Sequence, residues 1–282
     1  MKPIISILIT IYNGEPYIRE CMDSILGQTY RDFEVIAIDD CSTDHSIDLC
    51  REYAGKDSRI RVLENPSHDM INALNYGIKQ SRGDYIVRMD IDDVMYPHRI
   101  ERQVEVMEAH PEVAVCASWM RTFGLKEQIC VGGQGIVRHP MFHLLQGNFI
   151  ANPTTMLRTS FLQCHRLRYR KYPYAEDYKL WMDIAMHGGQ FWIIPEVLLK
   201  YRLSYQQVSY RNRDIQQRTS SKIRNEILNL LLEHNDFPDE YVYVILTYLG
   251  KYNQKGYVSD STIFNLCAEI LLSVCDKNDK DK

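Results

Sequence analysis

The fold of this chain is decided by residues 4–11, which read IISILITI. A nearly continuous aliphatic and β-branched run of this length is typical of a strand buried on both faces of a parallel sheet. Pro16 then opens a segment whose apolar residues share one helical face, namely Ile18, Cys21, Met22, Ile25 and Leu26. A second strand follows at residues 33–38. This order of strand, helix and strand predicts a right-handed α/β unit.

The same alternation continues over the first hundred residues. Further strands are predicted at 60–63 and 85–89, and a helix is predicted around Ile71, Leu74 and Ile78. Before them, Asp44 is a candidate N-cap for a helix that ends at Gly55. We therefore expect an α/β fold with a Rossmann-like, open, mixed but mostly parallel sheet flanked by helices.

The second half of the chain divides into a mixed region and a helical one. Helices are predicted from Pro97 to Ala109 and at 176–187, and strands at 113–116, 154–157, 191–194 and 197–203. After Ser204 the strand signals stop, and amphipathic stripes follow at 223–231, 242–249 and 263–271. We expect an α/β domain at residues 1–210 and a helical C-terminal extension at 211–282, whose apolar faces pack against protein.

Composition and charge exclude several classes of protein. With 45% hydrophobic and 25% charged residues, the 282-residue chain is an ordinary globular protein and not a disordered one. A net charge of −4 gives no support to a nucleic-acid partner. The eight cysteines contain no C-x-x-C, which excludes a zinc ribbon and favours reduced thiols in the cytoplasm. We expect neither a secretory leader nor a membrane span.

Polar and acidic residues follow three of the predicted strands. Residues 10–14 read TIYNG, residues 39–44 read DDCSTD and residues 90–93 read DIDD. The carboxyl ends of parallel strands meet at one edge of a sheet, where ligands bind. Carboxylates gathered there repel one another, which favours a bound hard cation, Mg²⁺ or Mn²⁺. Without a glycine-rich phosphate loop, a nucleotide would be held by metal and carboxylates.

Each acidic run also has a purely structural interpretation. Asp39 and Asp40 alone are compatible with turn chemistry, and residues 90–93 with capping of the helix after Pro97. Glu176 and Asp177 are compatible with ordinary first-turn helix charges. Their combination on successive strand ends favours a functional site.

The combined motifs resemble family 2 glycosyltransferases. The runs SILITIYN (6–13), IDDCSTD (38–44) and MDIDD (89–93) resemble the nucleotide-sugar-binding half of that family. The run AEDYKLW (175–181) is similar to its acidic motif at the acceptor site. The resemblance covers residues 4–210. It implies a GT-A fold, inverting transfer from a nucleoside-diphosphate sugar and dependence on a divalent metal ion.

The resemblance also implies roles for individual residues. The expected nucleotide contacts are Thr10, Tyr12, Asn13, Asp40 and Asp92, and the expected metal ligands are Asp93, Asp92 and Asp90. Asp177 is the expected general base, with Glu176 as its substitute. Asp177 begins a helix, so the helix dipole is expected to keep its pKa low.

Two stretches depart from the family pattern. Residues 65–70 read NPSHDM where the family often has a Gly-rich or Asn-rich stretch. Tyr201 and Arg202 are followed by Leu203 and Ser204, where many members carry a histidine. We therefore assign no second metal ligand there.

The sequence thus predicts an inverting hexosyltransferase of polysaccharide biosynthesis, moving a sugar from a nucleoside-diphosphate sugar to a glycan or lipid-linked acceptor. UDP is the preferred nucleotide. An inactive sugar-nucleotide-binding module and a sugar nucleotidyltransferase remain alternatives, although the second would want a Gly-rich basic loop after the first strand. The basic run HRLRYRK (165–171) leaves peripheral contact with the inner face of the membrane open, against a simple solvated loop. A homodimer also remains open.

Overall fold

The computed structural model of the chain describes residues 5–65, 67–205, 207, 211–234, 265, 267–269 and 272. Its first half alternates strands and helices: β1 (Ile5–Ile11), α1 (Ile18–Leu26), β2 (Phe33–Asp39), α2 (Ser46–Lys56), β3 (Ile60–Glu64), α3 (Met70–Gln80) and β4 (Tyr85–Asp90). The rest is more mixed: β5 (Val94–Met95), α4 (Arg99–Ala109), β6 (Val113–Gly124), β7 (Gln128–Cys130), β8 (Gly135–Val137), α5 (Pro140–Gln146), a 3₁₀ turn η1 (Asn152–Thr154), β9 (Met156–Arg158), α6 (Thr159–Cys164), α7 (Glu176–Met186), β10 (Gln190–Leu203) and α9 (Arg213–His234).

All these strands belong to one mixed sheet. Its order is β3-β2-β1-β4-β9-β6-β10-β5, with β7 paired to β6 and β8 paired to β10. The four strands from β3 to β4 are parallel. β9 runs antiparallel between β4 and β6. The predicted open, mixed and mostly parallel α/β sheet is confirmed.

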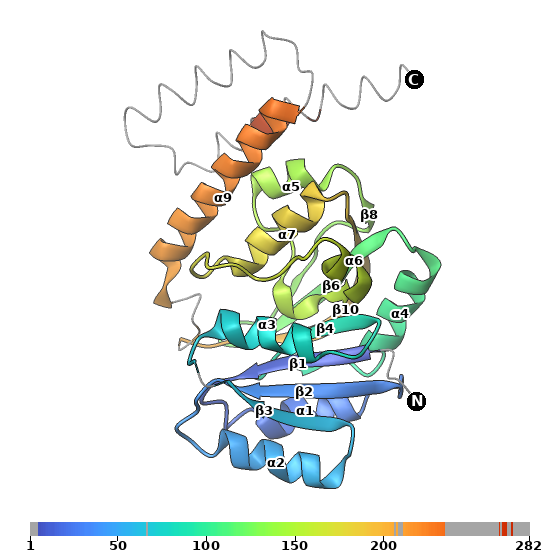
Figure 1. Cartoon of the computed structure of the whole chain (residues 1–282), viewed down its shortest axis with the longest axis vertical. Helices are drawn as coiled ribbons and strands as arrows, with labels where there is room; N and C mark the ends of the chain where they lie inside the picture. Colours follow the sequence, from blue (N-terminus) through green and yellow to red (C-terminus); the bar gives the residue numbers. More distant parts are fainter. Residues whose placement is uncertain are drawn as a thin grey trace.

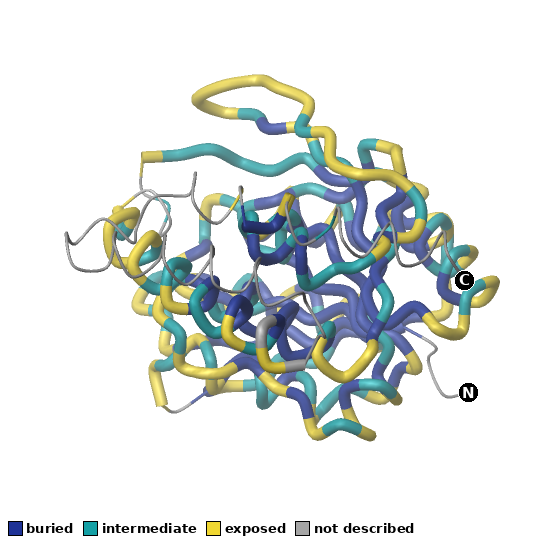
Figure 2. The backbone as a smooth tube through the Cα atoms, turned by 90° about the horizontal axis from the view of Figure 1, so that it is seen from above, coloured by how far each residue is buried: buried dark blue, intermediate teal, exposed yellow. Residues whose placement is uncertain are grey.

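Helices cover both faces of the sheet, and each face has its own apolar core. On one face α1, α2 and α4 pack on alternate residues such as Ile7 and Ile9 of β1. On the other face, Leu8 belongs to a cluster that includes residues of α3, α5, α7 and α9. Figure 1 shows α3 and α7 on the opposite side of the sheet from α1 and α2. In the burial view the buried segments fill the centre, and exposed loops surround them (Figure 2).

Gly77 explains how closely α3 approaches the sheet. A Cβ at this position would lie 2.1 Å from Cδ1 of Leu8 and 2.9 Å from Cδ1 of Ile38. A larger side chain would therefore displace the buried side chains of Leu8 and Ile38 or move the helix away from the strands. At the other end of α3, the backbone N–H of its N-cap Asp69 donates to Asp40 Oδ1 at 3.0 Å, so the N-terminus of α3 lies beside the carboxyl end of β2.

Several predicted boundaries were wrong. Residues 191–203 form one strand with β8, β6 and β5 as partners, because register shifts around Ile194 and Val197 accommodate Pro195. β6 is 12 residues long because β10 pairs along most of its length. α2 passes through Gly55 and ends at Lys56.

The C-terminal helix α9 packs on protein. Its apolar stripe, Ile223, Ile227, Leu228 and Leu231, is buried in the cluster that also contains α7. Cys267 and Ala268, in a short described stretch of helix, are buried in the same cluster. The predicted stripe at 242–249 and most of the one at 263–271 lie outside the described residues. Among the residues that the structure describes, no helix combines the length and the apolarity that a bilayer crossing requires.

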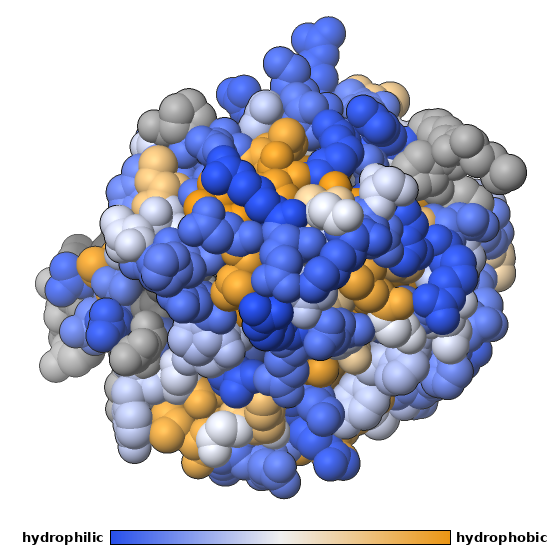
Figure 3. All heavy atoms as spheres, turned by 90° about the horizontal axis from the view of Figure 1, so that it is seen from below, coloured by the Kyte–Doolittle hydropathy of each residue, from blue (hydrophilic) through white to orange (hydrophobic). Residues whose placement is uncertain are grey.

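The face of the molecule opposite α9 is mainly hydrophilic. In the space-filling view from that side, apolar atoms gather in small patches that polar residues separate (Figure 3). Apolar patches of limited size are normal on a protein surface and mark no binding site by themselves.

Candidate active site

The carboxyl ends of β1 and β2 bring three of the predicted nucleotide contacts together. Tyr12 is 51% exposed directly after β1. Asn13 adopts a positive φ of 50° and accepts hydrogen bonds from the backbone N–H and the hydroxyl of Thr43, at 2.8 and 3.2 Å. Asp40 follows β2, and its backbone N–H donates to the carbonyl of Ile11 at 2.7 Å. This edge offers an exposed aromatic ring beside a carboxylate, which suits a nucleobase and its ribose.

Asn65 and residues 67–69 lie beside Asp40 and Tyr12, although their departure from the family pattern did not suggest it. Asn65 Nδ2 and the backbone N–H of Asp69 both donate to Asp40 Oδ1, at 2.6 and 3.0 Å. The ring of His68 lies 4.9 Å from that of Tyr12, and its Nδ1 lies 2.9 Å from the carbonyl of Asp40. Asp69 caps α3 by accepting from two backbone N–H groups. An aspartate directly before a helix is a recognisable N-cap in the sequence, and this local pattern indicates where the loop meets α3.

Asp90, at the end of β4, lies beside Thr10 of β1, and one arginine donates hydrogen bonds to both side chains. The register pairs Thr10 with Asp90 across β1 and β4. Arg88 Nη2 donates to Asp90 Oδ1 at 2.6 Å and to Thr10 Oγ1 at 3.1 Å. Thr10, a predicted nucleotide contact, and Asp90, a predicted metal ligand, therefore both accept hydrogen bonds from the guanidinium of Arg88.

Asp92 and Asp93 differ in their exposure and in their contacts. Asp92 is partly exposed, whereas Asp93 is fully buried, and its Oδ1 accepts the backbone N–H of Arg202 at 2.8 Å. Arg202 also donates from Nε to the carbonyl of Asp92 at 2.8 Å. Its guanidinium lies over the rings of Tyr17 and Phe123. The end of β10 thus fastens the acidic loop, while Oδ2 of Asp93 is buried without a hydrogen-bond partner among the described residues, so the expectation that Asp93 is a metal ligand stays a prediction.

The second group of acids lies at the N-terminus of α7. Asp177 accepts from Asn148 Nδ2 at 3.0 Å and from the backbone N–H of Tyr178 at 2.7 Å. Oε2 of Glu176 is buried and has no hydrogen-bond partner among the described residues. Asn148, in the loop after α5, carries no sequence motif and was missed. Nothing in the local sequence indicates that it meets Asp177.

Both acids on α7 hold their protons more tightly than free carboxyls. Burial, and then the charge of Asp177, raise the pKa of Glu176 to about 7. Burial raises the pKa of Asp177 to about 6, against the hydrogen bonds from Tyr178 and Asn148, which lower it. The expectation that the helix dipole keeps the pKa of Asp177 low was wrong, because the loss of solvation outweighs it.

The pKa values of Asp92 and Asp93 on the donor side are raised for the same two reasons, burial and a neighbouring carboxylate. Burial and the charge of Asp90 raise the pKa of Asp92 to about 6. Burial raises the pKa of Asp93 well above its usual value, and Asp90 and Asp92 add to the rise. Mutual repulsion of this kind is relieved when a cation binds.

The donor-side acids fit a divalent ion that takes some of its ligands from the protein and the others from a diphosphate. Within the described part of the chain, no three His, Cys, Asp or Glu side chains converge on one metal position. The expectation that Asp90, Asp92 and Asp93 hold a metal ion stays a prediction. Mg²⁺ and Mn²⁺ sites often use one or two carboxylates and take their other oxygens from phosphates. Asp90 and Asp92, partly exposed at the strand edge, suit that arrangement.

The basic run at 165–171 is partly neutralised by the protein itself. Arg170 forms an ion pair with Asp183 at 3.3 Å, and Lys171 forms one with Asp69 at 3.2 Å. Tyr169 is buried within the run. Arg166 and Arg168 remain exposed.

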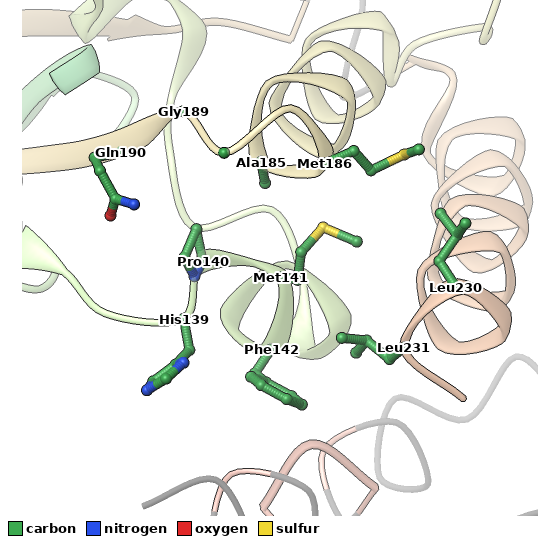
Figure 4. A pocket seen from close by; sticks show the side chains of 11 residues that line it. His139, Pro140, Met141, Phe142, Ala185, Met186, Gly189, Gln190, Leu230 and Leu231 are labelled. Atoms are coloured by element: carbon green, nitrogen blue, oxygen red, sulfur yellow. The ribbon is translucent and has the colours of Figure 1, made fainter. Parts of the chain in front are cut away.

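A separate apolar pocket lies at the other end of α7. Its volume is about 360 Å³, and its lining comes from α5, the end of α7, the start of β10 and α9. Figure 4 shows Met141, Met186 and Leu230 around it. Nine residues of helix separate Met186 from Asp177, which is about 14 Å. This pocket is therefore not the acidic site.

An open mixed sheet with acids at its carboxyl edge and a second acidic pair on a helix defines the GT-A class of glycosyltransferases. The chain belongs to glycosyl transferase family 2, whose sequence model matches residues 6–171. A Haemophilus influenzae protein described as an uncharacterized glycosyltransferase is 35% identical over 242 residues, which is 82% of this chain and 75% of that protein. The predicted family and fold are confirmed.

Solved structures show the same fold at low sequence identity. S. aureus TarS 1–349 in complex with UDP-GlcNAc matches with a TM-score of 0.64 and 18% identity, covering 84% of this chain and 68% of that chain. The mannosyltransferase PcManGT from Pyrobaculum calidifontis, in complex with GDP-Man and Mn²⁺, matches with a TM-score of 0.58 and 16% identity. That match covers 100% of this chain and 88% of the other.

Proposed function

We propose that this glycosyltransferase is an inverting hexosyltransferase of polysaccharide biosynthesis that uses a UDP-sugar and a divalent metal ion. Its acceptor is a hydroxyl group of a glycan or of a lipid-linked saccharide. The observation that carries the proposal is the electrostatic link between the two acidic groups. Burial is the largest cause of the raised pKa of Glu176 and of Asp177, and the negative charge of Asp90 adds to both rises, which supports a single site for the donor-side and helix acids.

The donor half of the reaction is assigned to the ends of β1, β2 and β4. Tyr12 and Asp40 would bind the nucleobase and ribose, with Asn13 and Thr10 beside them. Asp90 and Asp92 would hold the metal ion on the diphosphate, while Asp93 fixes their loop to β10. When bound, a divalent ion stabilises the negative charge that develops on a departing diphosphate.

The acceptor half is assigned to the N-terminus of α7. A neutral hydroxyl is a poor nucleophile, so its proton must be taken as it attacks the anomeric carbon. Asp177 would take that proton, and Asn148 would orient its carboxylate. With a pKa of about 6, Asp177 is ionised at neutral pH and is a stronger base than an ordinary aspartate. A single displacement from the face opposite the diphosphate inverts the configuration.

The extension is assigned a supporting role. We place the nucleotide-sugar and acceptor sites within residues 1–210 and the helical extension at 211–282. Lys179 of α7 pairs with Glu226 of α9 at 2.9 Å, and Tyr172 donates to the same carboxylate at 2.8 Å. These contacts tie α9 to the helix that carries Asp177.

The test begins with the donor. UDP-sugars and GDP-sugars are screened by thermal shift with and without Mn²⁺, and the stabilising donors are incubated with candidate saccharide acceptors. We expect Mn²⁺-dependent release of UDP and a product whose anomeric configuration, measured by NMR, is opposite to that of the donor. Binding without any release of nucleotide would instead indicate a sugar-nucleotide-binding module. A product with retained configuration would contradict the single displacement.

A further inference from the structure

Arg88 is a buried cation that neither the sequence motifs nor the proposed reaction explains. It lies in β4, two residues before Asp90, and is 3% exposed. Its Nε is buried and has no hydrogen-bond partner among the described residues. Burying a guanidinium costs several kcal/mol unless anionic groups compensate for the lost solvation. The surroundings of Arg88 must therefore supply that compensation.

The strand pattern places Arg88 on the face that carries α7. Side chains alternate along β4, so Ile86, Arg88 and Asp90 share one face. Ile86 lies in the apolar cluster that contains Tyr178 and Leu180 of α7. Arg88 is one step further along the strand, toward its carboxyl end. It therefore lies between the core under α7 and the donor-side acids.

The hydrogen bonds of Arg88 fix the donor edge. Nη2 bridges Asp90 Oδ1 at 2.6 Å and Thr10 Oγ1 at 3.1 Å, and Nη1 donates to the carbonyl of Met89. The ends of β1 and β4 are thereby held together by one planar group. A guanidinium keeps such a set of contacts in a fixed geometry, which a flexible ammonium does not.

The charge of Arg88 also acts on the helix acids. Glu176 is surrounded by groups that disfavour its ionisation, namely Asp177, Asp90 and the buried environment. Arg88 is the cation that opposes them at Glu176, and after Arg202 it also lowers the pKa of Asp92. Tyr169 also lies within electrostatic range of Arg88, but its buried phenol has a raised pKa and stays neutral.

We propose that Arg88 is a positioning residue shared by both halves of the active site, holding Asp90 against Thr10 for the donor and supplying the counter-charge for Glu176. The proposal rests on the glycosyltransferase function proposed above. Arg88 touches neither the acceptor nor the reacting carbon in this scheme. Its two roles are separable, because one depends on the shape of the guanidinium and the other on its charge.

Three variants separate these roles. Arg88→Lys keeps the charge and loses the planar fork, whereas Arg88→Met loses both. Arg158→Lys is the matched control, because Arg158 is also an arginine bonded to backbone carbonyls, but it pairs with Tyr85 at the opposite end of β4. Thermal unfolding shows which variants fold. ¹³C-carboxyl NMR then follows the titration of Glu176, assigned with Glu176→Gln, and calorimetry measures UDP binding with Mn²⁺.

We expect the titration midpoint of Glu176 to rise by about half a pH unit or more in Arg88→Met. In Arg88→Lys it should stay near that of the wild type, while UDP–Mn²⁺ affinity falls about tenfold because Asp90 loses its fixed geometry. Arg158→Lys should change neither. An unchanged midpoint in Arg88→Met, or an unchanged affinity in Arg88→Lys, would overturn the proposal. If the wild type binds neither UDP nor GDP with Mn²⁺, the proposed function fails instead, and the titration still reports on the counter-charge.

Discussion

The two acidic groups of the active site are held in opposite ways. On the donor side, Arg88 forms an ion pair with Asp90. The backbone N–H of Arg202, at the end of β10, donates a hydrogen bond to Asp93. On the acceptor side, Asp177 is held by a neutral amide and a backbone N–H. A carboxylate that binds cations needs a fixed position, whereas a base needs affinity for a proton. In the proposed function, this difference in partners would supply the difference in chemistry.

The largest expected effect comes from removing the base. Asp177→Asn keeps the size of the side chain and its bond to the backbone of Tyr178 but cannot accept a proton. We expect turnover to fall by about 10²–10⁴-fold, the usual contribution of a general base. The affinity for UDP with Mn²⁺, measured by calorimetry, should stay nearly unchanged. If nucleotide affinity collapses together with turnover, Asp177 belongs to the donor half and the comparison fails.

The second prediction separates the two neighbouring aspartates on the donor side. Asp92→Asn should weaken Mn²⁺-dependent UDP binding at least about tenfold, because an amide is a poorer ligand for a hard ion. Asp93→Ala should lower the free energy of unfolding by about 1–3 kcal/mol, because the buried N–H of Arg202 loses its acceptor. Calorimetry and denaturant unfolding measure the two effects. A strong loss of Mn²⁺ binding in Asp93→Asn, with Asp92→Asn unaffected, would identify Asp93 as the ligand.

The local parts of this site could be predicted from the sequence. The buried run of β1 and the acidic runs after β2 and β4 are contiguous, so their pattern alone puts Asp40 and Asp90 at one edge. Contacts between distant segments could not be predicted in this way. Asp93 meets Arg202 across 109 residues, and that contact exists only because β5 pairs with β10.

The raised pKa of Asp177 on α7 could not be predicted from the sequence for a related reason. The position of Asp177 in the first turn of a helix predicts a low pKa, and the backbone N–H of Tyr178 in that turn does lower it. Desolvation by segments far away in the chain outweighs it, and raises the pKa to about 6. Burial depends on the whole fold, so a pattern of neighbouring residues cannot supply it.

The third prediction concerns the cost of keeping Glu176 buried. Its pKa of about 7 lies above the value of about 4.3 for an unfolded chain. Below pH 4 both states are protonated and nothing is lost. As the pH rises from about 4 to 7, the unfolded state ionises first, so stability falls. Glu176→Gln should therefore raise the free energy of unfolding by about 1–3 kcal/mol at pH 8 and leave it unchanged at pH 4.

Urea unfolding at the two pH values measures this effect. Glu233→Gln is the control, because Glu233 is exposed on α9 and its replacement should change stability little at either pH. Equal stabilisation by Glu176→Gln at pH 4 and pH 8 would show that packing, and not proton affinity, is responsible.

The smallest expected effects come from two asparagines that serve the two halves separately. Asn65 donates to Asp40 at 2.6 Å, and Asn148 donates to Asp177 at 3.0 Å. The bond from Asn148 lowers the pKa of Asp177, so Asn148→Ala should raise it and move the acid limb of the pH–rate profile upward by about half a pH unit. Asn65→Ala should weaken UDP binding a few-fold, because a buried hydrogen bond contributes about 1 kcal/mol, and leave the acid limb in place. Measuring the pH dependence of turnover and the UDP affinity of both variants gives four results. If Asn65→Ala or Asn148→Ala changes both the UDP affinity and the acid limb of the pH–rate profile, Asp40 and Asp177 are not held independently. The difference between their partners would then not explain the difference in their chemistry.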